Sequence, residues 1–289
     1  MRMNIDRFTQ ASRRIDLTGL DFDVFERQPL TEDVLRCLRY MHDVELHTVC
    51  YLRDLLVTSA HRDPNITAFL TMWNMEEYWH GDAIGNVLAA HDEVAKQGRV
   101  LPMRQRLGWK DRLAPILHSL GSSIAGESFI AIHMTWGAVN EWTTQAAYAR
   151  LIAKAGHPVL TDLLKRIMKQ EGRHIDFYAG QAEERLDGDG RAQWMTRRAL
   201  KHLWAPVGSS VMPSSEQEHI TRFLFCDLEG ADAARRIDQR IDRLPGQSGL
   251  RLLERETVRV RSVSPSPAPN LRDWADIRDR EFHQVARAA

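Results

Sequence analysis

The chain has 289 residues, 43% of them apolar, and its 39 basic and 39 acidic side chains cancel. This length and apolar content suffice for one large or two small folded domains. The lack of a net charge argues against nucleic acid as a partner, because proteins that bind phosphate backbones carry a basic surplus. Three scattered cysteines make no disulfide framework. No uncharged apolar run reaches the roughly 18 residues of a membrane span, so we expect a cytoplasmic protein.

Apolar residues recur at helical spacing in four long stretches, while alternating β-branched runs are almost absent. Asp63-Pro64 supplies a capping residue and a first-turn proline for the second stretch. Gly156-His157-Pro158 separates the third stretch from the fourth. The stretches cover residues 32–58, 64–91, 122–155 and 158–186. This pattern predicts an all-α fold whose core is a bundle of four long helices, with additional helices at both ends.

The C-terminal part of the chain continues with helical patterns over residues 190–204, 214–243 and 246–260. The segment SVSPSPAPN that follows is rich in serine and proline, a composition typical of an extended linker. We therefore expect one helical domain over residues 1–261, and a linker with a peripheral tail over residues 262–289.

The motif Glu-x-x-His occurs three times. On an α-helix, residues i and i+3 project from the same face, so both could bind one metal ion. The chain's glutamates and histidines, placed at random, would form fewer than one such pair. Glu216 and His219 have an alternative explanation, because Ser215 and Glu218 show capping-box spacing at a predicted helix start. The remaining pairs, Glu77 with His80 and Glu171 with His174, lie inside long predicted helices.

A glutamate precedes each of these two motifs by a similar distance. Glu45 lies 32 residues before Glu77, and Glu141 lies 30 residues before Glu171. The order Glu, Glu-x-x-His, Glu, Glu-x-x-His is the ligand set of bundle-type di-iron or di-manganese sites. Each residue alone would by default lie on a solvated face, but both lone glutamates stand in apolar surroundings, where a buried carboxylate needs a partner. The pattern predicts a two-metal site with the ligands Glu45, Glu77, His80, Glu141, Glu171 and His174.

These motifs resemble the soluble, ferritin-like acyl-carrier-protein desaturase family. WNMEEYWHGDAIGNVL is similar to the family's first motif through Trp73, Glu76, Glu77, His80, Gly81 and Asp82. The other three helices match through Glu45 with Tyr51, Glu141 with Thr144, and Glu171 with Arg173 and His174. HITRFLFCDLEGADAARRIDQRIDRLPG and RLLERE look like the family's late helices, so the resemblance covers roughly residues 30–258.

The resemblance implies that Glu45 and His80 bind one iron, that Glu141 and His174 bind the other, and that Glu77 and Glu171 bridge them. It implies a catalytic position for Thr144 beside the oxygen-binding face, whereas the sequence alone favours a threonine that bonds to its own helical turn. It further implies two irons, with manganese possible, O2, an external electron donor of the ferredoxin type, and a homodimer. The leading reaction is desaturation of an acyl chain bound to acyl carrier protein or to another thioester.

Several positions depart from the family pattern. Gln170 stands where the family has an acidic residue, Tyr78-Trp79 where it has Asn-Arg, and Trp142 where it has arginine. Groups around the ligands tune a metal's chemistry, so these changes bear on the reaction more than on metal binding. Tyr78 and Trp142 could be redox-active neighbours of the metals, but we interpret them as packing residues, because aromatic residues at helical spacing usually belong to a core.

Two other functions stay open. One is a di-iron oxygenase that hydroxylates carbon or oxidises an amine in a specialised biosynthetic pathway. Ile167 stands where a known N-oxygenase type has a further histidine, which counts against that subtype. The other is a ferritin-like iron-binding protein, but this chain continues for more than a hundred residues after its last predicted ligand. Storage subunits usually need only a short bundle.

A carrier-bound substrate would need an apolar tunnel to the metals and a basic docking surface, because acyl carrier proteins are acidic. Two groups of basic residues could supply that surface, although for each group taken singly an ordinary solvated face is the default interpretation. The first group follows the second long helix, in what we expect to be a connection, and the second lies in a later helix. The groups are Arg99, Arg104, Arg106, Lys110 and Arg112, and then Arg197, Arg198 and Lys201.

Overall fold

The computed structural model describes residues 5–264 and Trp274, without the side chains of Arg7 and residues 108–112. The described part consists of helices and loops with no strand, so the predicted all-α fold is confirmed. None of these helices is long and apolar enough to cross a membrane. In chain order they are α1 (Ile5–Ala11), α2 (Val24–Arg27), α3 (Glu32–Leu56), the 3₁₀ helix η1 (Ser59–Arg62), α4 (Pro64–Ala89), α5 (Gln97–Ala125), α6 (Ser128–Ala155), α7 (Pro158–Leu186), α8 (Gly190–Leu203), α9 (Ser214–Phe225), α10 (Leu228–Ile241) and α11 (Leu252–Ser262).

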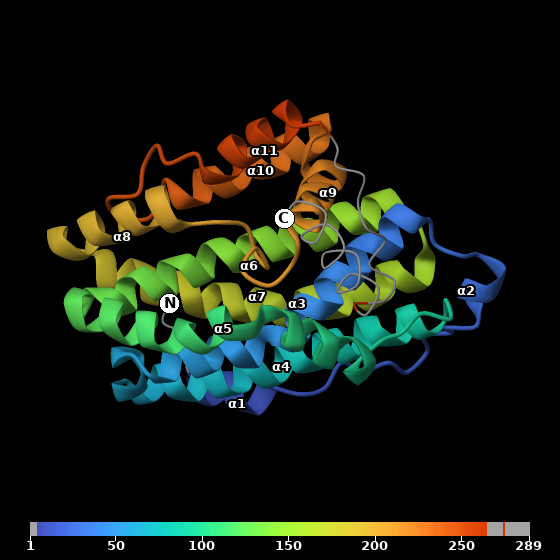
Figure 1. Cartoon of the computed structure of the whole chain (residues 1–289), viewed down its shortest axis with the longest axis horizontal. Coiled ribbons are helices and arrows are strands. Elements are labelled where there is room, and N and C mark those ends of the chain that lie inside the picture. Colours follow the sequence, from blue (N-terminus) through green and yellow to red (C-terminus); the bar gives the residue numbers. More distant parts are fainter. Residues whose placement is uncertain (1–4, 265–273, 275–289) are drawn as a thin grey trace, which may run out of the picture.

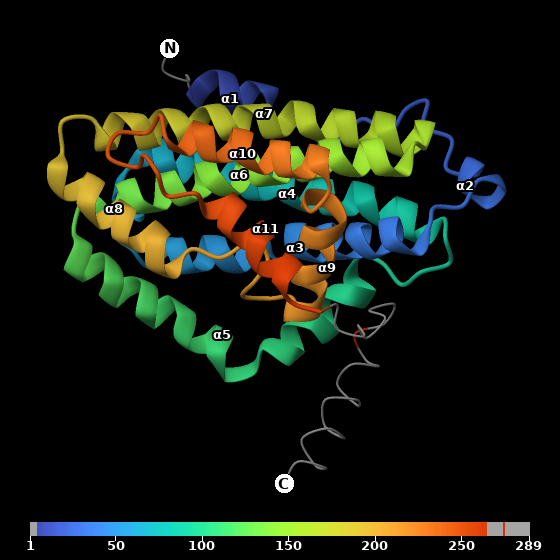
Figure 2. The ribbon, with the colours of Figure 1, turned by 90° about the horizontal axis from the view of Figure 1, so that it is seen from above.

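Four long helices run side by side along the longest dimension of the molecule (Figure 1). Helix α3 packs on α4, and α6 packs on α7, each pair being joined by a short connection. Helix α4 also contacts α7, and α3 contacts α6, so the two pairs face each other. Helix α5 joins α4 to α6 and runs along the outer side of α3, while α8, α9 and α10 lie against α6 (Figure 2).

Two helix boundaries follow the signals in the sequence. The Asp63 carboxylate accepts hydrogen bonds from the backbone N–H groups of Asn65 and Ile66, at 3.0 and 3.2 Å, and Pro64 is the first residue of α4. Gly156 ends α6 in the left-handed conformation, with φ of 60°, which glycine adopts without steric cost. His157 then caps α7.

Other boundaries differ from the predictions. The helix expected over residues 122–155 is divided at Gly126, where φ is 61°, and the residues before it belong to α5 rather than to a connection. The helix expected over residues 214–243 is divided at Asp227, whose carboxylate accepts a hydrogen bond from the N–H of Gly230 at 2.7 Å. In both cases apolar residues continue at helical spacing across the break, so periodicity alone does not reveal it.

The capping box expected at Ser215 does not form, because Pro213 is the residue before α9 and makes no side-chain cap. Glu216 instead forms an ion pair with Arg36 of α3, at 2.7 Å. His219 lies 3.8 Å from Asp33. This third Glu-x-x-His therefore serves the contact between α3 and α9, and it lies outside the groups of residues that could hold a metal in the described part of the chain.

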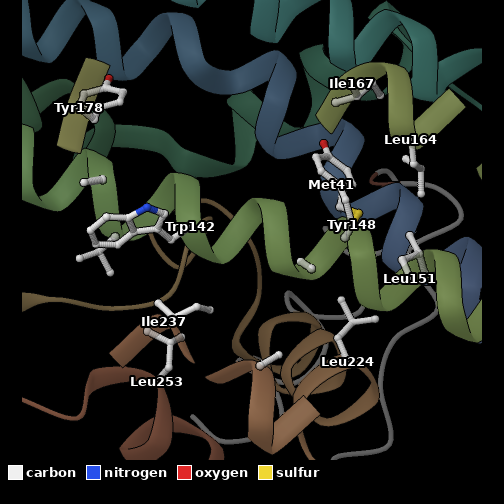
Figure 3. Close-up of a cluster of buried hydrophobic side chains, with 14 of the residues drawn as sticks. Met41, Trp142, Tyr148, Leu151, Leu164, Ile167, Tyr178, Leu224, Ile237 and Leu253 are labelled. Carbon is white, nitrogen blue, oxygen red and sulfur yellow. The ribbon is translucent and has the colours of Figure 1, made fainter. Parts of the chain in front are cut away.

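The main apolar core lies between the four long helices and extends under α10 and α11. Figure 3 shows Trp142 on α6 together with Ile237 of α10 and Leu253 of α11. Trp142 is buried, so its predicted packing role is confirmed. Tyr78 is 44% exposed, so the packing role predicted for it is wrong.

Trp274 is the one described residue in the predicted tail beyond Ser264. Its side chain is buried in a second apolar cluster with Met103 and Val211, and its indole N–H donates to the Asp43 carboxylate at 2.8 Å. The expectation of a peripheral tail therefore does not hold at Trp274. Residues 265–273 and 275–289 lie outside the described part of the chain.

Candidate metal centre

The six predicted ligands come together near the middle of the four long helices, and all six side chains are buried. They form two overlapping groups, and within each group the ligand atoms lie within 4.8 Å of one another. One group is Glu45, Glu77, His80 and Glu171, and the other is Glu77, Glu141, Glu171 and His174. Glu77 and Glu171 belong to both groups, as the predicted bridging residues should.

Glu77 and Glu171 each face both histidines. Glu77 places Oε2 3.4 Å from Nδ1 of His80 and Oε1 3.3 Å from Nδ1 of His174. Glu171 places Oε1 3.2 Å from Nδ1 of His80 and Oε2 2.9 Å from Nδ1 of His174. Each carboxylate thus offers one oxygen to either side, which is the geometry of a carboxylate that spans two neighbouring ions.

Glu45 and Glu141 lie at opposite ends of this arrangement, and each accepts one hydrogen bond from a neutral aromatic side chain. The Tyr148 hydroxyl donates to Oε1 of Glu45 at 2.5 Å. The Trp73 indole N–H donates to Oε1 of Glu141 at 2.9 Å. In each case the donor comes from a different helix than the carboxylate, so the packing of the helices fixes the position of both glutamates.

The outer nitrogen of each histidine is also held. Nε2 of His80 lies 3.0 Å from Oε1 of Gln170, and Nε2 of His174 lies 2.8 Å from Oε2 of Glu76. Glu76 is itself paired with Arg173, at 2.6 Å. These contacts leave Nδ1 of both histidines directed at the carboxylates, which is how a metal-binding histidine is oriented.

The protonation of the cluster fits a site for two divalent ions. Burial and the neighbouring Glu77 and Glu171 carboxylates raise the pKa of Glu45 and of Glu141 well above the usual value. Burial opposes ionisation of Glu77 and Glu171 as well. Hydrogen bonds with Glu45 and both histidines lower the pKa of Glu77, and the charge of His80 together with hydrogen bonds from both histidines lowers that of Glu171.

Burial would lower the pKa of the two histidines, but Glu171 and Glu77 raise the pKa of His80 to about 9, and hydrogen bonds to carboxylates raise that of His174. With protons on two carboxyls and on both imidazoles, the buried cluster carries no net charge. Two divalent ions in place of these four protons also leave it neutral, because four carboxylates balance their charge. The donor set of carboxylate oxygens and imidazole nitrogens suits iron and manganese. The residues present thus fit the two-metal centre that the sequence predicts.

A cavity of about 1680 Å³ opens directly beside this cluster. Glu45, Glu77, Glu141 and Thr144 line its inner wall, and Trp73, Tyr148 and Tyr178 lie around them. Thr144 is half-buried, one turn after Glu141 on α6, so its side chain is at the cavity surface next to the ligands. Thr144 therefore lines the same cavity as Glu141, and its predicted catalytic role stays a prediction.

The outer wall of the cavity consists of α5, α8 and the loop 204–212. It is mainly apolar, with Leu107, Ile124, Met195 and Leu203 among its residues. Polar side chains from other helices also line the cavity: His47 and Tyr51 of α3, and His133 and Asn140 of α6, together with Arg198 of α8. The cavity therefore offers apolar surface together with several hydrogen-bonding groups.

Some of the basic residues predicted for docking are buried or bound to backbone carbonyls, and others are exposed. Arg99 is buried and binds Asp43 through two hydrogen bonds, at 2.8 and 2.7 Å, so it is not part of any docking surface. Arg104 donates to the carbonyl of Leu46, and Arg197 donates to loop carbonyls. The side chains of Lys110 and Arg112 lie outside the described part. Arg198 and Lys201 are exposed, and Arg198 and Arg106 line the cavity.

Three contacts around the ligands are not among the sequence predictions, those of Tyr148, Glu76 and Gln170. Tyr148 was not singled out, although it lies seven residues after Glu141 and therefore on the same face of α6. Glu76 and Gln170 were noted only as part of the resemblance, although each occupies the same place directly before a bridging glutamate. The presence of a hydrogen-bonding residue directly before both bridging glutamates was the signal in the sequence that could have indicated these contacts.

Comparison with known proteins gives no further guide. No family model, no curated protein and no solved structure matches this chain. An assignment of function therefore rests on the geometry of the metal centre and its cavity.

Proposed function

We propose that this protein is a di-iron oxidase, with manganese as a possible substitute, which uses O2 and externally supplied electrons to desaturate an acyl chain. The observation that carries the proposal is the shared position of Glu77 and Glu171, each with one oxygen toward His80 and the other toward His174. Two neighbouring redox metals can together reduce O2 and supply an oxidant strong enough for unactivated C–H bonds.

The arrangement of the helices supports a ferritin-like core. Two helix pairs face each other, and the ligands come from one glutamate on each of two helices and a Glu-x-x-His on each of the other two. A single long connection between the pairs is also typical of that class, and here it is the helix α5.

The side chains of the chain would position the substrate and limit the access of water. The cavity reaches Glu45, Glu141 and Thr144, so an acyl chain within it would lie against the metal centre. Thr144 presents a hydroxyl at this surface, which can donate or accept a proton beside the ligands. The apolar wall excludes water from the remainder of the chain.

Delivery by an acidic carrier protein belongs to the proposal. Arg198 on α8 is exposed and lines the cavity, and Lys201 is exposed on the same helix, so an acidic partner could bring its acyl group to this side. A ferredoxin-type reductant, a homodimer and a cytoplasmic location follow from the family resemblance alone.

A di-iron oxygenase is the second candidate, and the polar groups in the cavity wall favour it. His47, Tyr51, His133 and Asn140 could bind polar atoms of a substrate that an unsubstituted acyl chain does not have. The size of the cavity, about 1680 Å³, also exceeds what a narrow acyl tunnel needs. Both candidates have an organic substrate, whereas a storage protein has no use for this cavity.

The test combines metal content with product analysis. Wild-type protein should bind two iron ions per chain, and Glu77→Ala and Glu171→Ala should each lose most of both ions, because each carboxylate serves both positions. Glu183→Ala, an exposed glutamate on α7, is the matched control and should keep both ions. A Glu77→Ala protein that binds two ions would contradict the bridging role.

Mass spectrometry of the product separates the candidates. Loss of two hydrogen atoms supports desaturation, and gain of one oxygen atom supports the oxygenase. Stoichiometric iron without any change in acyl-carrier, acyl-thioester or free-acid substrates would favour the iron-binding alternative.

A further inference from the structure

The contacts of the two histidines are related by an approximate internal symmetry. Glu76 stands directly before Glu77 on α4, and Gln170 stands directly before Glu171 on α7. Each reaches across to the histidine of the other helix. Oε1 of Gln170 lies 3.0 Å from Nε2 of His80, and Oε2 of Glu76 lies 2.8 Å from Nε2 of His174.

The direction of these hydrogen bonds follows from the surroundings. Nδ1 of each histidine faces the carboxylates, so Nε2 carries the hydrogen and donates it outward. The Gln170 side chain must present its oxygen to His80, because its NH2 group donates to the carbonyl of Arg13 at 2.8 Å. Gln170 and Glu76 are both buried, so water does not replace either contact.

The two hydrogen bonds differ in the chemical nature of the acceptor. Glu76 is a carboxylate paired with Arg173, at 2.6 Å, whereas Gln170 is a neutral amide. A hydrogen bond to an ionised acceptor is roughly twice as strong as one between neutral groups. A carboxylate acceptor also makes the imidazole a better electron donor to a metal, and loss of such an outer partner typically weakens metal binding about 10- to 100-fold.

The terminal carboxylates do not offset this difference. Glu45 and Glu141 each accept one hydrogen bond from a neutral donor, Tyr148 and Trp73 respectively. Glu77 and Glu171 are common to both halves. The residue that pairs with the outer nitrogen of each histidine is therefore the clearest difference between the two halves.

We propose that the two halves of the centre bind metal unequally, with Glu76 and Gln170 as positioning residues that set the order of filling. The half with Glu141 and His174 binds the first divalent ion, and the half with Glu45 and His80 binds the second about 10-fold more weakly. The Arg173 side chain, which shares the charge of Glu76, places the ratio at the lower end of the range. This inference rests on the proposed two-metal function.

The experiment is a titration of metal-free protein with Co²⁺. Calorimetry and the visible absorption of the bound ion monitor each addition. Wild-type protein should bind two equivalents in two steps. Gln170→Glu should tighten the second step about 10-fold, so that the two steps merge. Glu76→Gln should weaken the first step by a similar factor. Gln105→Glu, the same change at an exposed position on α5, should alter neither step.

Two ligand variants identify the halves. Glu45→Ala should remove the weaker step and keep the tighter one, and Glu141→Ala should remove the tighter step. Unfolding midpoints of the metal-free variants, compared with wild type, separate loss of binding from loss of folding. The double variant Glu76→Gln/Gln170→Glu should reverse the order, so that Glu45→Ala in that background removes the tighter step.

Two equivalents of equal affinity in wild-type protein, unchanged in Glu76→Gln and Gln170→Glu, would overturn the inference and leave the two-metal function intact. Binding of fewer than two Co²⁺ ions by folded wild-type protein would instead contradict the proposed function itself.

Discussion

Charged and apolar residues are distributed in opposite ways in two regions of the molecule: the four helices that carry the predicted ligands (α3, α4, α6 and α7) and the rim of the cavity. We define the rim as residues 113–125 of α5 together with α8. In the ligand-bearing helices even charged groups are buried, and Asp43 of α3 binds the guanidinium of Arg99 with both side chains inaccessible. On the rim, large aliphatic side chains are 41% to 77% exposed: Leu113, Ile116, Leu117, Leu120 and Ile124.

The charges follow the same division. The rim carries four basic residues and no acidic one, in a chain whose total charge is zero: Arg191, Arg197, Arg198 and Lys201, all on α8. Buried, paired charges specify one packing of the helices, because any other packing leaves a charge without a partner. An exposed apolar and basic surface marks a region that meets other molecules. The difference separates the part that holds the predicted metal ligands in place from the part that lines the outer side of the cavity.

The largest effect should come from breaking the buried pair. Arg99→Ala leaves the Asp43 carboxylate buried without its main counter-charge, and we expect a loss of about 3 to 5 kcal/mol in the free energy of unfolding. Arg198→Ala on the rim, an exposed arginine, should change it by less than about 0.5 kcal/mol. Urea unfolding measures both. Similar losses in the two variants would remove the distinction between the regions.

Replacing glycine with alanine should change the free energy of unfolding in opposite directions in the two regions. A Cβ atom at Gly137, on α6, would lie 2.3 Å from the ring of the buried Tyr178, so Gly137→Ala should destabilise the protein by about 1 to 3 kcal/mol. Gly121 on the rim has open space around it, and Gly121→Ala should stabilise the helix by about 0.5 to 1 kcal/mol. Thermal unfolding of both variants checks the pair, and a stabilised Gly137→Ala would contradict the close packing of α6 on α7.

His133 tests how far the dry interior extends toward the cavity. Burial, with a smaller contribution from His118, lowers the pKa of His133 to about 3. In the unfolded chain a histidine takes up a proton below about pH 6.5. The folded state therefore loses stability as the pH falls from 6.5 toward 3, and the contribution of His133 is complete only above 6.5.

His133→Gln should remove that loss. Relative to wild type, the variant should gain about 1 kcal/mol between pH 7 and pH 5.5. Denaturant unfolding at the two pH values gives the comparison. An unchanged difference would mean that His133 titrates in contact with water, and that the cavity wall belongs with the rim.

The smallest effect should come from the exposed aliphatic side chains. Leu117 is 65% exposed, so Leu117→Gln should change the free energy of unfolding by less than about 0.5 kcal/mol. A loss above about 2 kcal/mol in dilute solution would show that another surface covers the rim. Repeating the measurement at several protein concentrations would then reveal whether that surface belongs to a second copy.

The sequence was sufficient for the elements with local signals. The pair Asp63-Pro64 predicts the start of α4, and Gly156-His157-Pro158 predicts the end of α6 and the start of α7. The spacing Glu-x-x-His places two side chains on one helical face. The division at Asp227 was missed, because its cap depends on one hydrogen bond to Gly230 that apolar spacing does not show. Helix α5 was missed because Pro102 and Pro115 lie inside it, and a proline within a segment normally argues against one continuous helix.

The contacts around the ligands could not be predicted in the same way. The hydrogen bond from Tyr148 to Glu45 joins α6 to α3, and that between His80 and Gln170 joins α4 to α7. Such contacts depend on how two helices rotate against each other, which no spacing within one helix determines. The metal, the substrate and the role of Thr144 remain predictions that only binding and product measurements can test.

The crossed hydrogen bonds also have a kinetic consequence. The pair α3 and α4 contains one half of the ligands, and α6 and α7 contain the other, so the full set assembles only when the two pairs dock. Interactions that form after the folding transition state slow unfolding and leave the folding rate almost unchanged. If the two pairs dock after that transition state, the metals of the proposed centre should lengthen the lifetime of the folded chain and leave its folding rate close to that of the metal-free protein.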